Sequence, residues 1–83
     1  MTEEGLFEYA IGKGWDKILE TVRTDHSLPE IAVALNMTEI WLLRELQITC
    51  GVGLMSLRKS EKGYTYTVTE LGLKFLEKQK RPK

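Results

Sequence analysis

The sequence predicts an α+β domain in which several helices come first, a two-stranded β-hairpin follows, and one more helix closes the chain. Three observations predict this order. Apolar residues from Trp15 to Val22 recur at helical spacing. Residues 64–68 alternate larger side chains with threonines, at the period of a β-strand. Capping residues before further apolar stretches mark the starts of other helices.

The chain of 83 residues is expected to form one domain, because 42% of its residues are hydrophobic, 29% are charged, and no linker divides it. We expect a core at residues 15–76, an N-terminal extension or helix at residues 1–14, and a basic tail at residues 77–83. No apolar stretch is long enough to cross a bilayer, and the start Met1-Thr2-Glu3-Glu4 lacks the features of a signal peptide. We therefore expect a cytoplasmic protein without membrane contact, and the lone Cys50 agrees with a reducing compartment.

Two apolar stripes precede the first clear turn. The first contains Leu6, Phe7, Ala10 and Ile11, and the second runs from Trp15 to Val22, with Gly12-Lys13-Gly14 between them. The stripes continue in register, but each glycine costs about 1 kcal/mol in a helix interior. The pattern therefore allows either one helix or two.

The next two helices are marked by their caps. Ser27 and Glu30 can cap each other, and Pro29 fits the first turn, while Asn36 tolerates the left-handed conformation that ends a helix. Thr38 caps a following helix that is expected to reach about Cys50. A short turn thus joins two helices.

The hairpin and the last helix complete the prediction. Residues 54–57 and 64–68 are the expected strands, and residues 58–63 are the expected polar turn. Thr69 caps a final helix with apolar residues Leu71, Leu73, Phe75 and Leu76 and with basic residues near its end.

Three stretches resemble the winged helix-turn-helix domain of small bacterial and archaeal regulators. "SLPEIAVALNMT" is similar to the family's capped second helix and turn, "GLM" at residues 53–55 to its approach to the wing, and "YTVTELG" to its closing pattern. The resemblance covers roughly residues 15–76. It implies a three-helix core, a two-stranded β-hairpin wing and a C-terminal helix.

The resemblance also implies DNA binding and regulation of transcription. The second helix of the pair would lie in the major groove, with Leu42 and Leu46 toward the core and the wing near the DNA backbone. The residues expected to contact double-stranded DNA are Thr38, Ile40, Trp41 and Arg44 on the helix, with Ile48 as a further groove-facing position, and Arg58, Lys59 and Lys62 clustered in the wing.

Each of these contacts has a structural alternative. Arg44 could pair with Glu39 or Glu45, and Trp41 could pack on its own domain or on a partner. The wing lysines could simply keep a strand edge soluble. Tyr64 and Tyr66 are expected to pack on the core.

The charge is distributed unevenly although the net charge is zero. Residues 1–45 hold 4 Lys and Arg against 9 Asp and Glu, and residues 46–83 hold 8 against 3. This asymmetry suggests one side that faces a polyanion, although a solvated lysine-rich helix would also explain it.

Two functions remain open. The first is a homodimeric regulator that pairs through its first and last helices, with Leu6, Phe7, Leu73 and Phe75 as dimer contacts. The second is a protein-interaction adaptor, suggested by the apolar run Ile40-Trp41-Leu42-Leu43. An enzyme is not expected, because no nucleophile, phosphate-binding glycine loop or metal-ligand spacing is seen, and His26 is expected at the surface. No cofactor or metal is expected either.

Overall fold

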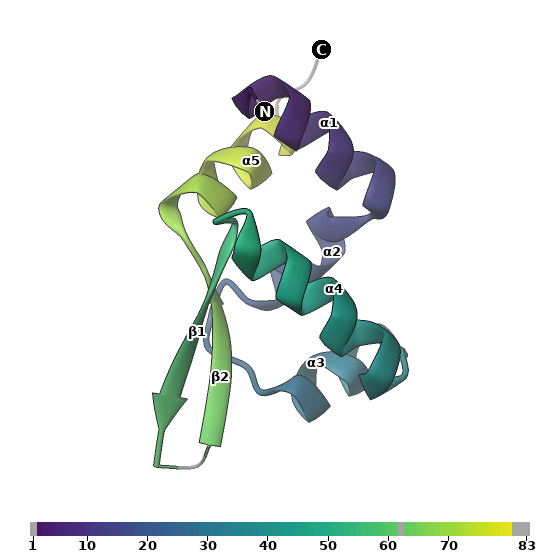
Figure 1. The fold of residues 1–83 in the computed structure, drawn as a ribbon, viewed down its shortest axis with the longest axis vertical. Helices are drawn as coiled ribbons and strands as arrows, with labels where there is room; N and C mark the ends of the chain where they lie inside the picture. The colour runs from purple at the N-terminus through teal and green to yellow at the C-terminus, as the bar shows by residue number, and fades with distance from the viewer. Residues whose placement is uncertain (1, 62, 81–83) are drawn as a thin grey trace.

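The computed structural model describes residues 2–61 and 63–80, and in them it has five helices and one antiparallel hairpin (Figure 1). This arrangement confirms the predicted α+β class. The elements in chain order are α1 (Glu3–Lys13), α2 (Trp15–Thr21), α3 (Leu28–Leu35), α4 (Glu39–Gly51), β1 (Met55–Ser60), β2 (Gly63–Val68) and α5 (Glu70–Lys80). Figure 1 shows α1 and α5 at one end of the molecule and the hairpin tip at the other.

Two helices, not one, form the N-terminal part of the chain. Gly14 stands between α1 and α2 with φ 74°, in the left-handed region that glycine enters at low cost. Its N–H donates to the carbonyl oxygen of Ile11 at 3.0 Å. Residues 3–13 are therefore a helix of their own, and the chain turns at an elbow, residues 12–14, before α2 begins.

The α3–α4 pair follows the predicted caps closely. The Ser27 N–H donates to Glu30 Oε1 at 2.8 Å, and the Glu30 N–H donates to Ser27 Oγ at 3.4 Å. Asn36 ends α3 with φ 54°, and Thr38 Oγ1 accepts from the Trp41 N–H at 3.4 Å to start α4. Because these caps need only neighbouring residues, sequence alone located the turn correctly.

The hairpin differs from the prediction in the length of its first strand. β1 reaches Ser60, so Arg58 and Lys59 are strand residues paired with Thr65 and Tyr64, not turn residues. A strand in a two-stranded ribbon can be polar on much of its length, because little of it faces a core. The polar composition of residues 58–60 was therefore wrongly interpreted as a turn.

Backbone hydrogen bonds hold the base of the hairpin against the helices. The Tyr66 N–H donates to the His26 carbonyl at 2.7 Å, and the His26 N–H returns a bond of 3.1 Å. The Val68 N–H donates to the Val22 carbonyl at 2.9 Å, and the Thr69 N–H to that of Leu54 at 3.1 Å. β2 is thus bonded to β1 on one edge and to the loop after α2 on the other.

The final helix begins at the predicted cap and returns to α1. Thr69 Oγ1 accepts from the Gly72 N–H at 3.2 Å. The rings of Phe7 and Phe75 meet edge to face with centroids 5.2 Å apart, and Lys74 Nζ lies 2.8 Å from Glu3 Oε1. α5 includes residues 77–80 of the expected basic tail, whereas residues 81–83 lie outside the described part of the chain.

A single apolar core joins all these elements. Its fully buried side chains include Trp15, Leu19, Ile31, Leu42, Leu46, Leu54 and Phe75. Within the described residues, no helix has both the length and the apolar character needed to cross a membrane.

Gly72 is the glycine of the "YTVTELG" stretch, and its surroundings leave no room for a side chain. A Cβ there would collide with the Leu54 carbonyl and the Val68 side chain. We expect Gly72→Ala to lower the free energy of unfolding by about 1–3 kcal/mol, measured by urea denaturation.

The control is Gly12→Ala in α1, where an added methyl group meets nothing within 4 Å. This change should raise the stability by about 0.5–1 kcal/mol, because alanine is the better helix former. Equal effects of the two substitutions would contradict the close approach at Gly72.

Candidate functional site

One side of α4 packs against the core. Leu42 and Leu46 are fully buried, as the sequence predicted. Glu45 lies beside them with 7% of its surface exposed, and its Oε1 accepts from Trp15 Nε1 at 3.2 Å. Thr49 Oγ1 donates to the Glu45 carbonyl at 2.6 Å. These contacts fix the rotation of α4 about its axis.

The opposite side of α4 is exposed. Ile40 is 86% exposed and Trp41 56%, and both Thr38 and Arg44 lie at the surface. The four helix residues expected to contact DNA are therefore brought together on the first turns of α4, outside the core. Trp41 packs only partly on its own domain, so much of its ring is left for DNA or a partner.

Arg44 also lacks the partners that the sequence offered it. Among residues 2–61 and 63–80, no ion pair involves Arg44. Glu45 points instead toward Trp15, on the other side of the helix. The guanidinium of Arg44 is therefore available to a ligand.

Sequence reasoning missed one exposed residue, Gln47, on the same side of α4. Gln47 follows Arg44 by one turn, and Leu43 and Ile48 flank it with 38% exposure each. The signal was present, because helical phase places Gln47 opposite the buried Leu42 and Leu46. The surface of α4, meaning Ile40, Trp41, Leu43, Arg44, Gln47 and Ile48, is mostly apolar.

The basic residues of the hairpin do not form the expected cluster. Arg58 and Lys59 are neighbours on β1, so their side chains leave opposite faces of the hairpin. Arg58 Nη1 lies 3.7 Å from Asp25 Oδ2, in a pair open to solvent on both sides. Lys59 is exposed, and Lys62 lies outside the described residues. The hairpin thus offers its charges on two separate faces.

The two tyrosines of β2 lie on the same face of the hairpin but differ in how far they are exposed to solvent. Tyr66 is buried and lies opposite Leu57, whereas Tyr64 is 57% exposed nearer the tip. Only Tyr66 packs on the core as expected.

Burial raises the pKa of the Tyr66 hydroxyl, and the nearby Cys50 thiol adds to this increase. Burial also raises the pKa of Cys50, which makes its thiol a poor nucleophile near neutral pH.

Three of the four expected dimer contacts belong to the core of a single chain. Leu6, Phe7 and Phe75 are buried, and Lys78 Nζ lies 5.4 Å from the centre of the Phe7 ring. Phe7 and Phe75 pack against each other across α1 and α5, and all three residues leave little surface for a second copy. Leu73 alone of the four is exposed, at 42%.

His26 has a structural role at the base of the hairpin. Its backbone pairs with Tyr66, and its Nδ1 lies 2.8 Å from the Thr24 carbonyl oxygen. His26 is partly exposed, as expected of a residue near the surface, and it also takes part in these contacts. Across the described ranges, no three His, Cys, Asp or Glu side chains are placed to hold a metal ion.

The different environments of the two tryptophans can be measured. Trp15 is fully buried and Trp41 is largely exposed. We expect Trp41→Phe to shift the fluorescence emission to shorter wavelength and to reduce quenching by acrylamide, because only the buried ring remains. Quenching that is unchanged by the substitution would show that Trp41 is covered in solution.

The candidate site is thus an exposed, mostly apolar side of α4 with one arginine, next to a hairpin with cations on both faces. Comparison of the chain with protein-family models, with curated proteins and with solved structures finds no match.

Proposed function

We propose that the chain is a winged helix-turn-helix domain that binds double-stranded DNA and regulates transcription. The observation that carries the proposal is the exposed side of α4. Thr38, Ile40, Arg44 and Gln47 are exposed. Thr38 caps the second helix in a helix-turn-helix order, and the other three residues follow on its first three turns. In proteins of this kind those turns enter the major groove.

The side chains of α4 divide into three kinds of contact. Arg44 can donate two hydrogen bonds to a guanine edge, and Gln47 can pair with an adenine edge. Ile40 and Trp41 can contact thymine methyl groups or sugars. Thr38 uses its oxygen to accept from the Trp41 N–H, so its hydroxyl proton stays free for a phosphate. The helix would therefore read bases with few charges.

The hairpin would supply the phosphate contacts. Arg58 is held only by a solvent-exposed pair with Asp25, and such pairs contribute at most about 1 kcal/mol. Arg58 can therefore exchange the carboxylate for a phosphate at little cost. Lys59 is exposed on the opposite face of β1, and Lys62 follows in the sequence. With zero net charge over the chain, the affinity should depend on these few side chains.

A homodimer remains part of the proposal, with a revised contact surface. Pairing through the first and last helices would use the exposed residues Ile11 on α1 and Leu73 on α5, since Phe7 and Phe75 are buried. A dimer would present two copies of α4 to half-sites about one DNA turn apart.

The DNA proposal predicts salt-dependent binding to a random-sequence duplex. We expect binding at low salt, measured by fluorescence anisotropy, that weakens as salt rises. Replacing Arg58 and Lys59 by alanine should reduce the slope of log K against log salt by about 2, or about 1 per lost phosphate contact.

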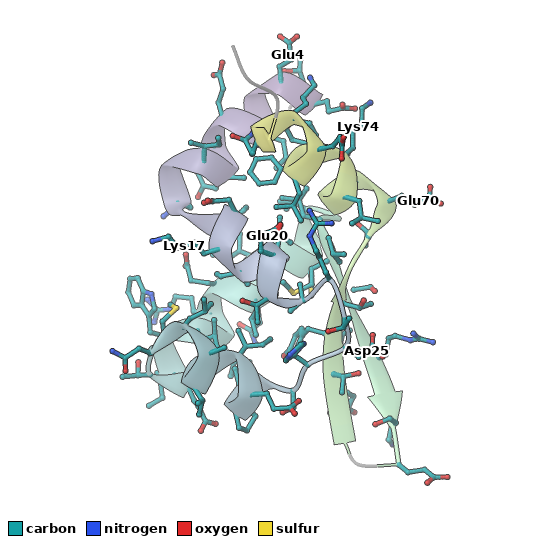
Figure 2. All side chains as sticks on the ribbon, turned by 180° about the vertical axis from the view of Figure 1, so that it is seen from behind. Glu4, Lys17, Glu20, Asp25, Glu70 and Lys74 are labelled. Carbon is teal, nitrogen blue, oxygen red and sulfur yellow. The ribbon has the colours of Figure 1, made fainter. Side chains whose placement is uncertain are left out.

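The matched control is Lys74→Ala on α5, whose ammonium pairs with Glu3 and lies far from the hairpin tip (Figure 2). This variant should keep the wild-type slope. Absence of binding by the wild-type chain at low salt would refute the proposal, and so would equal slopes for the hairpin variant and the wild type.

A protein-interaction adaptor is the second candidate, and one observation favours it. Ile40 is 86% exposed, and its neighbour on α4, Trp41, is 56% exposed. Side chains of this size are usually covered when they gather on a surface. A partner with an apolar groove would cover them without any need for the hairpin cations.

One substitution separates the two functions. If α4 lies in the groove, Ile40→Lys brings a cation to the DNA and should tighten binding to random duplex, with a salt slope steeper by about 1. If α4 docks on a protein, the added charge should leave DNA binding unchanged and abolish the complex with that partner. Anisotropy and size-exclusion chromatography of the two chains distinguish these outcomes.

A further inference from the structure

A cavity of about 400 Å³ lies where the elbow between α1 and α2 faces α4. We call it the elbow cavity. Residues 12–14 form one wall, Lys17 of α2 another, and Trp41 and Glu45 of α4 a third. Its remaining lining is apolar and consists of Ile18, Leu35 and Met37. Cavities of about 300–1,000 Å³ with apolar walls and a few polar groups are the usual sites of small molecules.

Glu45 gives the cavity a nearly buried carboxylate. Only 7% of its surface is exposed, and its Oε1 accepts from Trp15 Nε1, a neutral donor. Among the described residues no fully buried side-chain oxygen lacks a hydrogen-bond partner. The second oxygen of Glu45, Oε2, has no such partner, so it keeps some accessible surface, and Glu45 lines the cavity. A carboxylate with so little water and one neutral donor favours a cationic partner.

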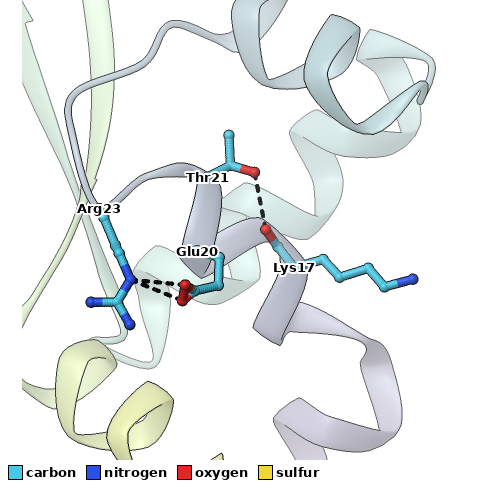
Figure 3. A network of polar contacts seen from close by, with 4 residues as sticks. All are labelled: Lys17, Glu20, Thr21 and Arg23. Carbon is cyan, nitrogen blue, oxygen red and sulfur yellow. Dashed lines mark hydrogen bonds and ion pairs between the residues drawn. The ribbon is translucent and has the colours of Figure 1, made fainter. Parts of the chain in front are cut away.

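Two lysines give the same cavity positive charge. Within the described residues, neither Lys13 nor Lys17 is in an ion pair. Lys13 Nζ lies 5.6 Å from the centre of the Tyr9 ring. The side chain of Lys17 extends away from Glu20, whose carboxylate is already bonded to Arg23 Nε at 2.8 Å (Figure 3). Both ammonium groups are therefore available to an anionic group in the cavity.

The negative and positive charges of the elbow cavity indicate which charges its ligand should have. A purely cationic ligand would meet two lysines, and a purely anionic one would meet the Glu45 carboxylate. A zwitterion satisfies both if its ammonium group faces Glu45 and its carboxylate faces Lys13 and Lys17. The ring of Trp41 and the side chains of Leu35 and Met37 then suit an apolar or aromatic substituent.

We propose that the elbow cavity binds a free α-amino acid with an apolar side chain. Its ammonium group is bonded to Glu45 Oε2, its carboxylate to both Lys13 and Lys17, and its side chain packs on Trp41. Because the ligand would contact α4 and the elbow together, it would bind the folded chain and stabilise it. The proposal does not depend on whether α4 binds DNA.

The test is a tryptophan fluorescence titration of the full chain with L-phenylalanine and L-leucine, excited where phenylalanine does not absorb. We expect a saturable change for at least one of them. For each bound amino acid, its N-acetyl derivative lacks the ammonium group and its amide lacks the carboxylate. Both derivatives should bind at least about tenfold more weakly, because each leaves a charged group of the cavity unpaired.

Glu45→Gln is the matched variant, since its amide oxygen can still accept from Trp15 Nε1 while its charge is gone. We expect at least about tenfold weaker binding, and Lys17→Ala, an exposed position on α2, should weaken binding in the same way without disturbing the core. Glu20→Gln, outside the cavity, is the control and should bind like the wild type.

Three results would overturn the proposal. These are no saturable change with either amino acid up to about 10 mM, equal affinity for an amino acid and both of its derivatives, or unchanged affinity in Lys17→Ala together with Glu45→Gln. If Glu45→Gln fails to fold, the outcome with Lys17→Ala alone decides.

Discussion

The hydrogen bond between Trp15 and Glu45 determines how the helices present their surfaces. A fully buried indole needs an acceptor for its N–H, and the acceptor comes from α4, thirty residues further along the chain. The bond holds the carboxylate inward, so the helix cannot rotate without leaving both groups unpaired. Leu42 and Leu46 are then directed to the core, and Ile40 and Arg44 to solvent. Every functional proposal made for α4 depends on this orientation.

The orientation explains why α4 has so few charges on its exposed side. One of its two glutamates is used internally, which leaves Glu39 and Arg44 as the exposed charged residues of the helix. Base reading by such a helix would depend on shape and on apolar contact, while phosphate contacts would come from the hairpin. The same apolar surface also suits a protein partner. The positive charge on the hairpin favours DNA over a protein as the ligand of α4.

Sequence predicted the parts of the fold that are decided locally. The box of Ser27 and Glu30, the left-handed Asn36 and the Thr38 cap each need only a few neighbouring residues. Contacts between distant residues were not predictable in this way. Glu45 was considered a partner for Arg44 because nothing in the sequence places Trp15 beside it. Phe7 and Phe75 were assigned to a dimer because their pairing within one chain depends on how α1 meets α5. The exposed side of α4 was predicted in part, since helical phase follows from the buried leucines.

The contact between α1 and α5 has a consequence for synthesis of the chain on the ribosome. Phe7 is made sixty-eight residues before Phe75, the ring that packs against it. The ion pair of Glu3 with Lys74 spans the same interval. During translation the side of α1 that packs on α5 therefore stays uncovered until α5 has been made. The α3–α4 pair can already form at that stage, because its caps need only neighbouring residues. The core is therefore completed only after α5 has been made, and a chaperone that binds nascent apolar helices would meet α1 before α5.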